Sequence, residues 1–230
     1  MGSTRLPGKV LRPLAGKPML QHVIERVNRA KLVDETLVAT SDQPADREIE
    51  EFCASVECPC FRGDENDVLD RYYQSATQRG ADVVVRITSD CPLIDPDVID
   101  QVVAAREQHE ADYASNIAPT RTFPRGLDTE VFRFDVLERC WREAPAGPNR
   151  EHVTSYIYGH PERFRVSGVT NDSDASAHRW TVDTPEDYAL LERIYAHFGN
   201  NRFGWGDVLS LLAEHPEWSE LNAHVEQKVH

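Results

Sequence analysis

Residues 82–92 read D-V-V-V-R-I-T-S-D-C-P, and this stretch decides the fold. Its valines and isoleucine are typical of a buried β-strand, because branched side chains pack well on a pleated surface. Ser89 and Asp90 then lead into Pro92, which cannot donate a backbone hydrogen bond to a neighbouring strand. The stretch therefore predicts a strand over 82–88 that ends in a polar loop.

The segments on either side alternate between strand and helix patterns. Further strands are predicted at 35–40, 112–116, 129–134 and 164–169. Helices are predicted at 17–31, 44–57, 66–79, 96–109, 135–143, 149–159 and 185–197, with one or two short helices from 205 onward. Such alternation favours a mixed, mainly parallel sheet with helices on both faces. We expect one α/β domain over residues 1–230, with a helical appendage at about 200–230.

Polar residues follow the predicted strands that end at Thr40 and Thr88, as Ser41-Asp42 and Ser89-Asp90. We also expect a last strand that ends at Val182, and Asp183-Thr184 follows it. In parallel α/β sheets, ligands bind beyond the carboxyl ends of the strands, so we expect these three loops to share one rim. Two acidic side chains at adjacent strand ends would form an oxygen-rich metal site. The alternatives are that Asp183 only caps the following helix and that Asp90 is an ordinary turn residue.

The N-terminal segment Gly2–Lys9 reads G-S-T-R-L-P-G-K. Glycine lets the backbone approach an oxyanion closely, and Arg5 and Lys9 could neutralise phosphate charge. The spacing is not that of a Walker loop. A solvated turn that carries two surface cations is the alternative.

The composition limits the classes of partner. The chain has 39 acidic and 25 basic residues, for a net charge of −14, which disfavours nucleic acid as a partner. No stretch is long and apolar enough to cross a membrane and the start does not resemble a secretion signal, so we expect a cytoplasmic protein without a membrane partner. The 5 cysteines include no C-x-x-C pair, which favours free thiols over a zinc site.

The N-terminal segment is one of several motifs that occur in a fixed order along nearly the whole chain. The others are G-K-P-M-L at 16–20, D-V-L-D-R-Y-Y at 67–73, S-D-C-P-L-I-D at 89–95, P-R-G-L-D at 124–128, R-E-H-V-T at 150–154 and R-W-T-V-D-T-P-E-D at 179–187. Together they resemble the cytidylyltransferases that make CMP-activated acidic sugars. The resemblance is strongest to the branch named for spore coat polysaccharide biosynthesis protein F, and next to 3-deoxy-manno-octulosonate cytidylyltransferase.

The resemblance implies a three-layer nucleotide-diphospho-sugar transferase (Rossmann-like) fold. It also implies transfer of CMP from CTP to a sugar or sugar acid with release of pyrophosphate, Mg²⁺ as the cofactor, a role in surface polysaccharide biosynthesis and a homodimer. Arg5, Lys9, Asp90 and Asp183 would be the catalytic residues, and the two aspartates would bind Mg²⁺. The nucleotide contacts that the resemblance implies are Gly2, Ser3, Arg5, Lys9, Arg71 and Ser89.

Other motif residues are candidates for binding the acceptor sugar. Arg125 and Asp128 flank a glycine turn and could grip a carboxylate or hydroxyl groups, although the same residues suit a simple hairpin turn. Arg150 and His152 open a predicted helix and could contact the substrate or serve only the fold. Arg71, on another predicted helix, could equally be a surface residue.

One departure from the family pattern concerns the sheet. Relatives place an apolar strand and an Ala-Arg pair ahead of the motif that begins here at Met1, so we expect the first, central strand to be missing from this sequence. A form extended upstream by about ten residues, the length of one strand, is expected to be more stable and more active.

Two other functions stay open. One is a glycosyltransferase of the same fold, which would need a D-x-D motif where this chain has a single Asp90. The other is a non-catalytic nucleotide-binding assembly protein.

Overall fold

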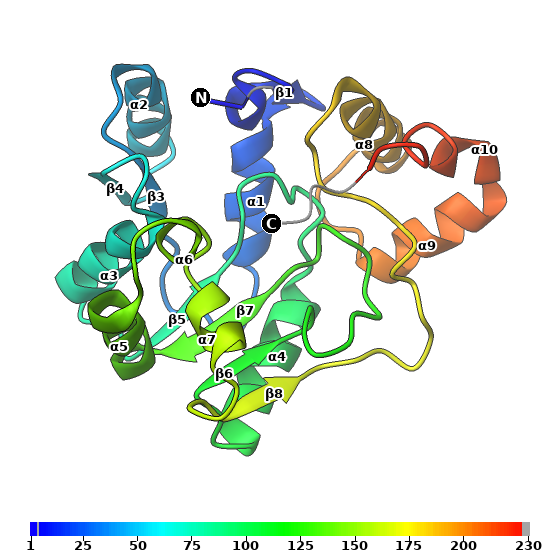
Figure 1. Ribbon diagram of the computed structural model, residues 1–230. Helices are drawn as coiled ribbons and strands as arrows, with labels where there is room; N and C mark the ends of the chain where they lie inside the picture. The colour runs from blue at the N-terminus through cyan, green and yellow to red at the C-terminus, as the bar shows by residue number, and fades with distance from the viewer. Residues whose placement is uncertain (4, 227–230) are drawn as a thin grey trace.

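The computed structural model describes residues 1–3 and 5–226, and its strands form three sheets (Figure 1). A short antiparallel hairpin and a parallel pair precede a four-stranded sheet of order β5-β7-β6-β8. The strands are β1 (Pro13–Leu14), β2 (Lys17–Pro18), β3 (Val38–Ser41), β4 (Cys60–Gly63), β5 (Val83–Arg86), β6 (Tyr113–Ser115), β7 (Glu130–Arg133) and β8 (Val166–Gly168). The predicted α/β class is confirmed.

The four-stranded sheet is mixed because β7 lies between two antiparallel neighbours. It pairs antiparallel with β5 and with β6, and β6 pairs parallel with β8. The other parallel pair is β3 with β4. Strands β3 and β5 are not paired with each other, so the strands we expected in one sheet are divided at this place.

Helices cover both faces of the four-stranded sheet. Alternate strand residues point to opposite faces: Phe132 packs with α3, α5 and α7 residues, and its neighbour Val131 packs with Val102 of α4. The helices are α1 (Met19–Val27), α2 (Arg47–Ser55), α3 (Val68–Arg79), α4 (Pro96–Gln108), α5 (Phe134–Glu143), α6 (Pro148–Glu151), α7 (Ser155–Gly159), α8 (Pro185–Phe198), α9 (Trp205–Glu214) and α10 (Pro216–Ser219), with 3₁₀ turns η1 (Lys9–Leu11) and η2 (Pro44–Asp46).

Capping residues fix the ends of α8, the helix that follows Asp183. The Thr184 hydroxyl accepts a hydrogen bond from the backbone N–H of Asp187, and the Asp187 carboxylate accepts one from the backbone N–H of Thr184, which forms a capping box. Gly199 ends the helix in the left-handed conformation at φ 64°. These local signals hold the start of α8, and with it Asp183, in a defined place.

The structure corrects three predicted elements. Residues 60–63, to which we assigned no structure, form β4, because pairing with β3 satisfies their backbone groups. The predicted helix over 149–159 is broken into α6 and α7 by Val153, whose left-handed φ of 56° ends α6. The segment before Asp183 is not a strand: its bridge to another segment is the single pair Arg125 and Arg179.

The C-terminal helices contribute to the largest apolar core. Val208, Leu211 and Leu212 of α9 are buried with Trp180 and with residues of α8. Helices are therefore present where we expected an appendage, and they are packed against the rest of the chain (Figure 1). None of the helices in the described part of the chain is long and apolar enough to span a membrane.

Candidate active site

The loop that follows β5 lies directly beside the segment that precedes α8. The backbone N–H of Val182 donates to the carbonyl oxygen of Asp90 at 2.9 Å, and the Thr181 hydroxyl donates to the same oxygen at 3.4 Å. These two contacts bring Asp90 and Asp183 together, although the two residues are far apart in the sequence. The third predicted loop, which follows β3, is hydrogen-bonded to the end of β4: the Asp42 N–H donates to the Gly63 carbonyl at 2.7 Å.

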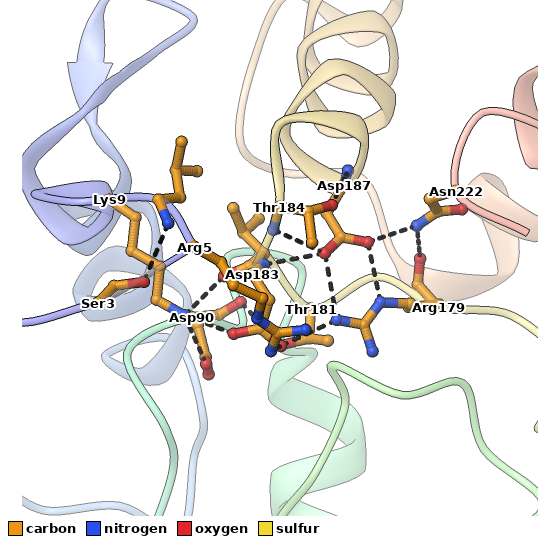
Figure 2. Close-up of polar contacts among 12 residues, drawn as sticks. Ser3, Arg5, Lys9, Asp90, Arg179, Thr181, Asp183, Thr184, Asp187 and Asn222 are labelled. Atoms are coloured by element: carbon orange, nitrogen blue, oxygen red, sulfur yellow. Dashed lines mark hydrogen bonds and ion pairs between the residues drawn. The ribbon is translucent and has the colours of Figure 1, made fainter. Parts of the chain in front are cut away.

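Lys9 joins the two aspartates. Its ammonium donates to Asp90 Oδ2 at 3.0 Å, to Asp183 Oδ1 at 2.8 Å and to the carbonyl of Val182 at 2.7 Å. Arg5 reaches the other oxygen of Asp183, with a guanidinium nitrogen 3.0 Å from Oδ2 (Figure 2). The structure thus brings together all four residues that we predicted as catalytic.

The N-terminal loop directs Lys9 toward the aspartates by its own local geometry. Gly8 adopts a left-handed φ of 67° immediately before η1, a conformation that glycine tolerates without strain. Leu6 is buried in the main core and anchors the loop, and its backbone N–H donates to the Ser3 hydroxyl at 3.3 Å. Gly2 is exposed, and Thr4 of the predicted motif lies outside the described residues.

Opposite charges shift the proton affinities within this cluster. Burial lowers the pKa of Lys9, but the charge and hydrogen bonds of Asp90 and Asp183 raise that pKa by more, so it lies above its ordinary value. Burial raises the pKa of Asp183, but Lys9, Arg5 and Arg179 outweigh it, so this pKa lies below its ordinary value. The lysine is therefore held as a cation and Asp183 as an anion.

A second, more deeply buried group of polar side chains lies on the side of Asp183 away from Lys9 (Figure 2). The guanidinium of Arg179 donates to both oxygens of Asp187, and one of its nitrogens donates to Asp183 Oδ2 at 2.8 Å. The Asn222 amide donates to Asp187 Oδ1 at 2.9 Å. We did not predict these residues as part of the site. Arg179 and Asp187 lie within a quoted motif, but no local pattern marks Asn222.

The loop that contains Arg125 and Asp128 is fixed against the same segment. The Arg125 N–H donates to the His178 carbonyl at 3.0 Å, and the Trp180 N–H donates to the Arg125 carbonyl at 2.7 Å. Gly126 has a φ of 104°, and a Cβ there would lie 2.6 Å from the Trp180 carbonyl carbon, so glycine is required. Arg125 lines a hollow of about 300 Å³ together with Trp180.

Asp128 turns toward an arginine that we did not predict. It makes a two-pronged ion pair with Arg121, at 2.6 Å from Nη1 to Oδ1 and 2.9 Å from Nη2 to Oδ2. Burial lowers the pKa of Arg121, but Asp128 raises it by more. Burial raises the pKa of Cys91 most, and the negative charges of Asp90 and then of Asp128 raise it further.

The remaining predicted residues occupy other surroundings. Arg71 of α3 packs over Gly63, and its Nε is buried without a hydrogen-bond partner among the described residues. The Arg150 guanidinium is engaged by Asp67, the N-cap of α3, and by the Trp141 carbonyl. His152 follows the end of α6, which corrects our prediction that it opens a helix; Ser89 precedes Asp90 in the loop after β5.

Known proteins resemble this chain over most of its length. Residues 1–212 match the family described as Cytidylyltransferase. The chain belongs to the cytidylyltransferase family. It is 33% identical over 225 residues to spore coat polysaccharide biosynthesis protein SpsF of Bacillus subtilis, with 94% of this chain and 92% of that protein covered.

Two solved structures resemble this cytidylyltransferase. A cytidylyltransferase from Leptospira borgpetersenii is 31% identical with a TM-score of 0.90, over 100% of this chain and 95% of the other. CMP:2-keto-3-deoxy-manno-octonic acid synthetase, solved in complex with CTP, is 20% identical with a TM-score of 0.64, over 85% of this chain and 95% of the other, and shares the fold. The predicted family and nucleotidyltransferase fold are confirmed.

Proposed function

We propose that this chain is a Mg²⁺-dependent cytidylyltransferase that joins CMP from CTP to a sugar or sugar-acid acceptor and releases pyrophosphate, in the biosynthesis of a surface polysaccharide. The observation that carries the proposal is the convergence of Lys9 on Asp90 and Asp183, beside Arg5. Cations suited to phosphate and carboxylates suited to a metal thus meet at one place, in a chain of the cytidylyltransferase family.

The residues present fit a magnesium ion. Three oxygen atoms, from Asp90, Asp183 and the Val182 carbonyl, surround the Lys9 ammonium, so the position suits a cation with oxygen ligands. The described residues contain no group of three or more acidic, histidine or cysteine side chains that could hold a metal by themselves. Magnesium in phosphate-transfer sites usually takes one or two carboxylates and completes its shell with phosphate and water. Bound by these aspartates, Mg²⁺ would polarise the α-phosphate as a Lewis acid.

Lys9 and Arg5 would exchange partners when the nucleotide binds. Both are paired with carboxylates here, and a triphosphate presents stronger negative charge to the same loop. We expect Lys9 and Arg5 to turn to the phosphates and to stabilise the charge on the leaving pyrophosphate. The backbone N–H groups of Gly2 and Ser3 would add hydrogen bonds to phosphate oxygens, and Arg71 and Ser89 are further proposed nucleotide contacts.

The reaction would be a direct in-line displacement. A sugar hydroxyl attacks the α-phosphorus and releases its proton to water, and the new bond from oxygen to phosphorus forms as the bond from phosphorus to pyrophosphate breaks. Such chemistry depends on positioning and on neutralising charge, so we assign no protein nucleophile. Arg125, Asp128, Arg150 and His152 are the proposed acceptor contacts. A homodimer and a cytoplasmic location remain predictions.

The test is release of pyrophosphate from CTP with Mg²⁺ and a panel of sugar acids. Asp90→Asn and Asp183→Asn should each abolish release, because each loses a charged metal ligand and keeps its shape. Asp172→Asn, at an exposed site outside the cluster, is the matched control and should keep wild-type activity. Full activity in both site variants would refute the metal assignment.

Thermal stability with each nucleoside triphosphate then tests the base specificity, because a ligand that binds the native state raises its stability. Stabilisation by CTP alone supports the proposal. Stabilisation without turnover of any acceptor would favour the non-catalytic assembly protein instead.

A further inference from the structure

The two oxygens of Asp183 have different partners. Oδ1 accepts from Lys9, which also contacts Asp90, so Oδ1 is the oxygen that faces the other aspartate. Oδ2 accepts from Arg5 at 3.0 Å and from Arg179 at 2.8 Å. A metal shared by the two aspartates would use Oδ1, and this requires that something else holds Oδ2 in place.

Arg5 and Arg179 differ in how firmly they are held. The Arg5 side chain is 29% exposed on the N-terminal loop, and the Arg179 side chain is 7% exposed. In the proposed reaction Arg5 and Lys9 move to the phosphates. Among the described residues, Arg179 would then be the cation that remains hydrogen-bonded to Asp183.

Asp187 anchors Arg179. Its side chain is 0% exposed and makes a two-pronged pair with Arg179, with Nε 2.9 Å from Oδ1 and Nη2 3.1 Å from Oδ2. Asp187 also accepts from the backbone N–H groups of Asp183 and Thr184, at 2.9 and 3.0 Å. One buried carboxylate thus fixes both the main chain of Asp183 and the arginine that contacts its side chain.

Asn222, in the C-terminal segment, is hydrogen-bonded to both Asp187 and Arg179. Its amide donates to Asp187 Oδ1 and to the carbonyl of Arg179, both at 2.9 Å, and the residue is buried. Asn222 lies beyond residue 212, where the family match ends. The C-terminal segment therefore contacts the group that holds Asp183 (Figure 2).

We propose that Arg179, held by Asp187 and Asn222, is a positioning residue that fixes Oδ2 of Asp183 and turns Oδ1 toward Asp90 for the metal. This inference rests on the proposed function, because it assigns Asp183 as a metal ligand. Hydrogen-bonding partners of metal ligands typically change metal affinity by about 10- to 100-fold when they are replaced.

The test measures Mn²⁺, used in place of Mg²⁺, by the paramagnetic resonance signal of the free ion. Arg179→Lys keeps the charge but loses the two-pronged geometry, and it should weaken Mn²⁺ binding by about 10-fold or more. Asn222→Ala removes only hydrogen bonds to the group and should weaken binding by about 2- to 10-fold. If Arg179→Lys does not fold, Asn222→Ala still tests the proposal.

The control separates metal binding from stability. Arg26 is also a buried arginine, 1% exposed, and it contacts Asn201 and the Phe203 carbonyl. Arg26→Lys should lower the melting temperature and leave Mn²⁺ affinity at the wild-type value. Equal Mn²⁺ affinity in wild type, Arg179→Lys and Asn222→Ala would overturn the positioning role and leave the proposed function standing. Absence of Mn²⁺ binding to wild type would overturn the metal assignment itself.

Discussion

Replacing Lys9 by methionine removes the cation that separates Asp90 from Asp183 and keeps a side chain of similar length. The ammonium makes three hydrogen bonds of 2.7–3.0 Å, and the Lys9 side chain is 12% exposed. Breaking a fully buried ion pair costs about 3–5 kcal/mol. The two carboxylates keep 25% and 16% exposure, so water compensates in part and we expect a loss of about 2–3 kcal/mol. For a chain of this size, that lowers the melting temperature by about 4–12 °C.

A divalent cation should reverse this loss. In Lys9→Met the oxygens of Asp90 and Asp183 no longer have the ammonium between them, so Mg²⁺ or Mn²⁺ can bind without displacing it. A ligand present at about 100 times its Kd adds about 2.7 kcal/mol of stability, which is close to the expected loss. The variant should therefore gain more stability from the metal than wild type does.

The pH dependence has a defined sign. The pKa of Lys9 is raised above 10.5, so its stabilising contribution is present below that pH and is lost as pH rises through the folded value. The pKa of Asp183 is lowered below 3.8, so its contribution is present above that pH and is lost as pH falls through the folded value. The stability difference between wild type and Lys9→Met should be largest between about pH 5 and pH 9 and should shrink in acid.

Differential scanning fluorimetry with and without Mn²⁺ measures these effects. Lys17→Met is the matched control, because Lys17 is 45% exposed and pairs with Glu25 at the surface, where such pairs contribute about 0–1 kcal/mol. An unchanged melting temperature for Lys9→Met would refute the role of Lys9 as counterion. Equal stabilisation of both proteins by Mn²⁺ would show that the metal binds elsewhere.

Three further substitutions test other parts of the structure. Gly126→Ala places a Cβ 2.6 Å from the Trp180 carbonyl carbon at a φ of 104°, and should cost about 1–3 kcal/mol in urea unfolding. Glu130→Gln leaves the guanidinium of Arg86 without its carboxylate at a site where the side chains of Glu130 and Arg86 are 2% and 19% exposed, and should cost about 3–5 kcal/mol, measured in the same way at pH 7. Asp128→Asn weakens its ion pair with the neighbouring arginine, and should raise the KM for the acceptor several-fold with little change in the KM for CTP; the opposite pattern would place this loop on the nucleotide side.

The secondary structure and the family can be predicted from the sequence, because both depend on residues that are close together in the chain. The valine-rich strand at 83–86, the amphipathic helices and the Thr184 capping box depend on neighbouring residues only. The ordered motifs further identify the N-terminal Arg5 and Lys9 and the acidic residues that follow. The sequence therefore predicts which residue types the site requires.

Tertiary structure alone decides how these residues meet. β4 exists because β3 lies beside it, and Asp183 meets Asp90 through a main-chain hydrogen bond from Val182 that no periodicity reveals. Asn222 reaches Asp187 from the turn that follows α10, which is distant in sequence. Such contacts depend on the packing of segments remote in sequence, and buried polar groups take the partners that packing brings within reach.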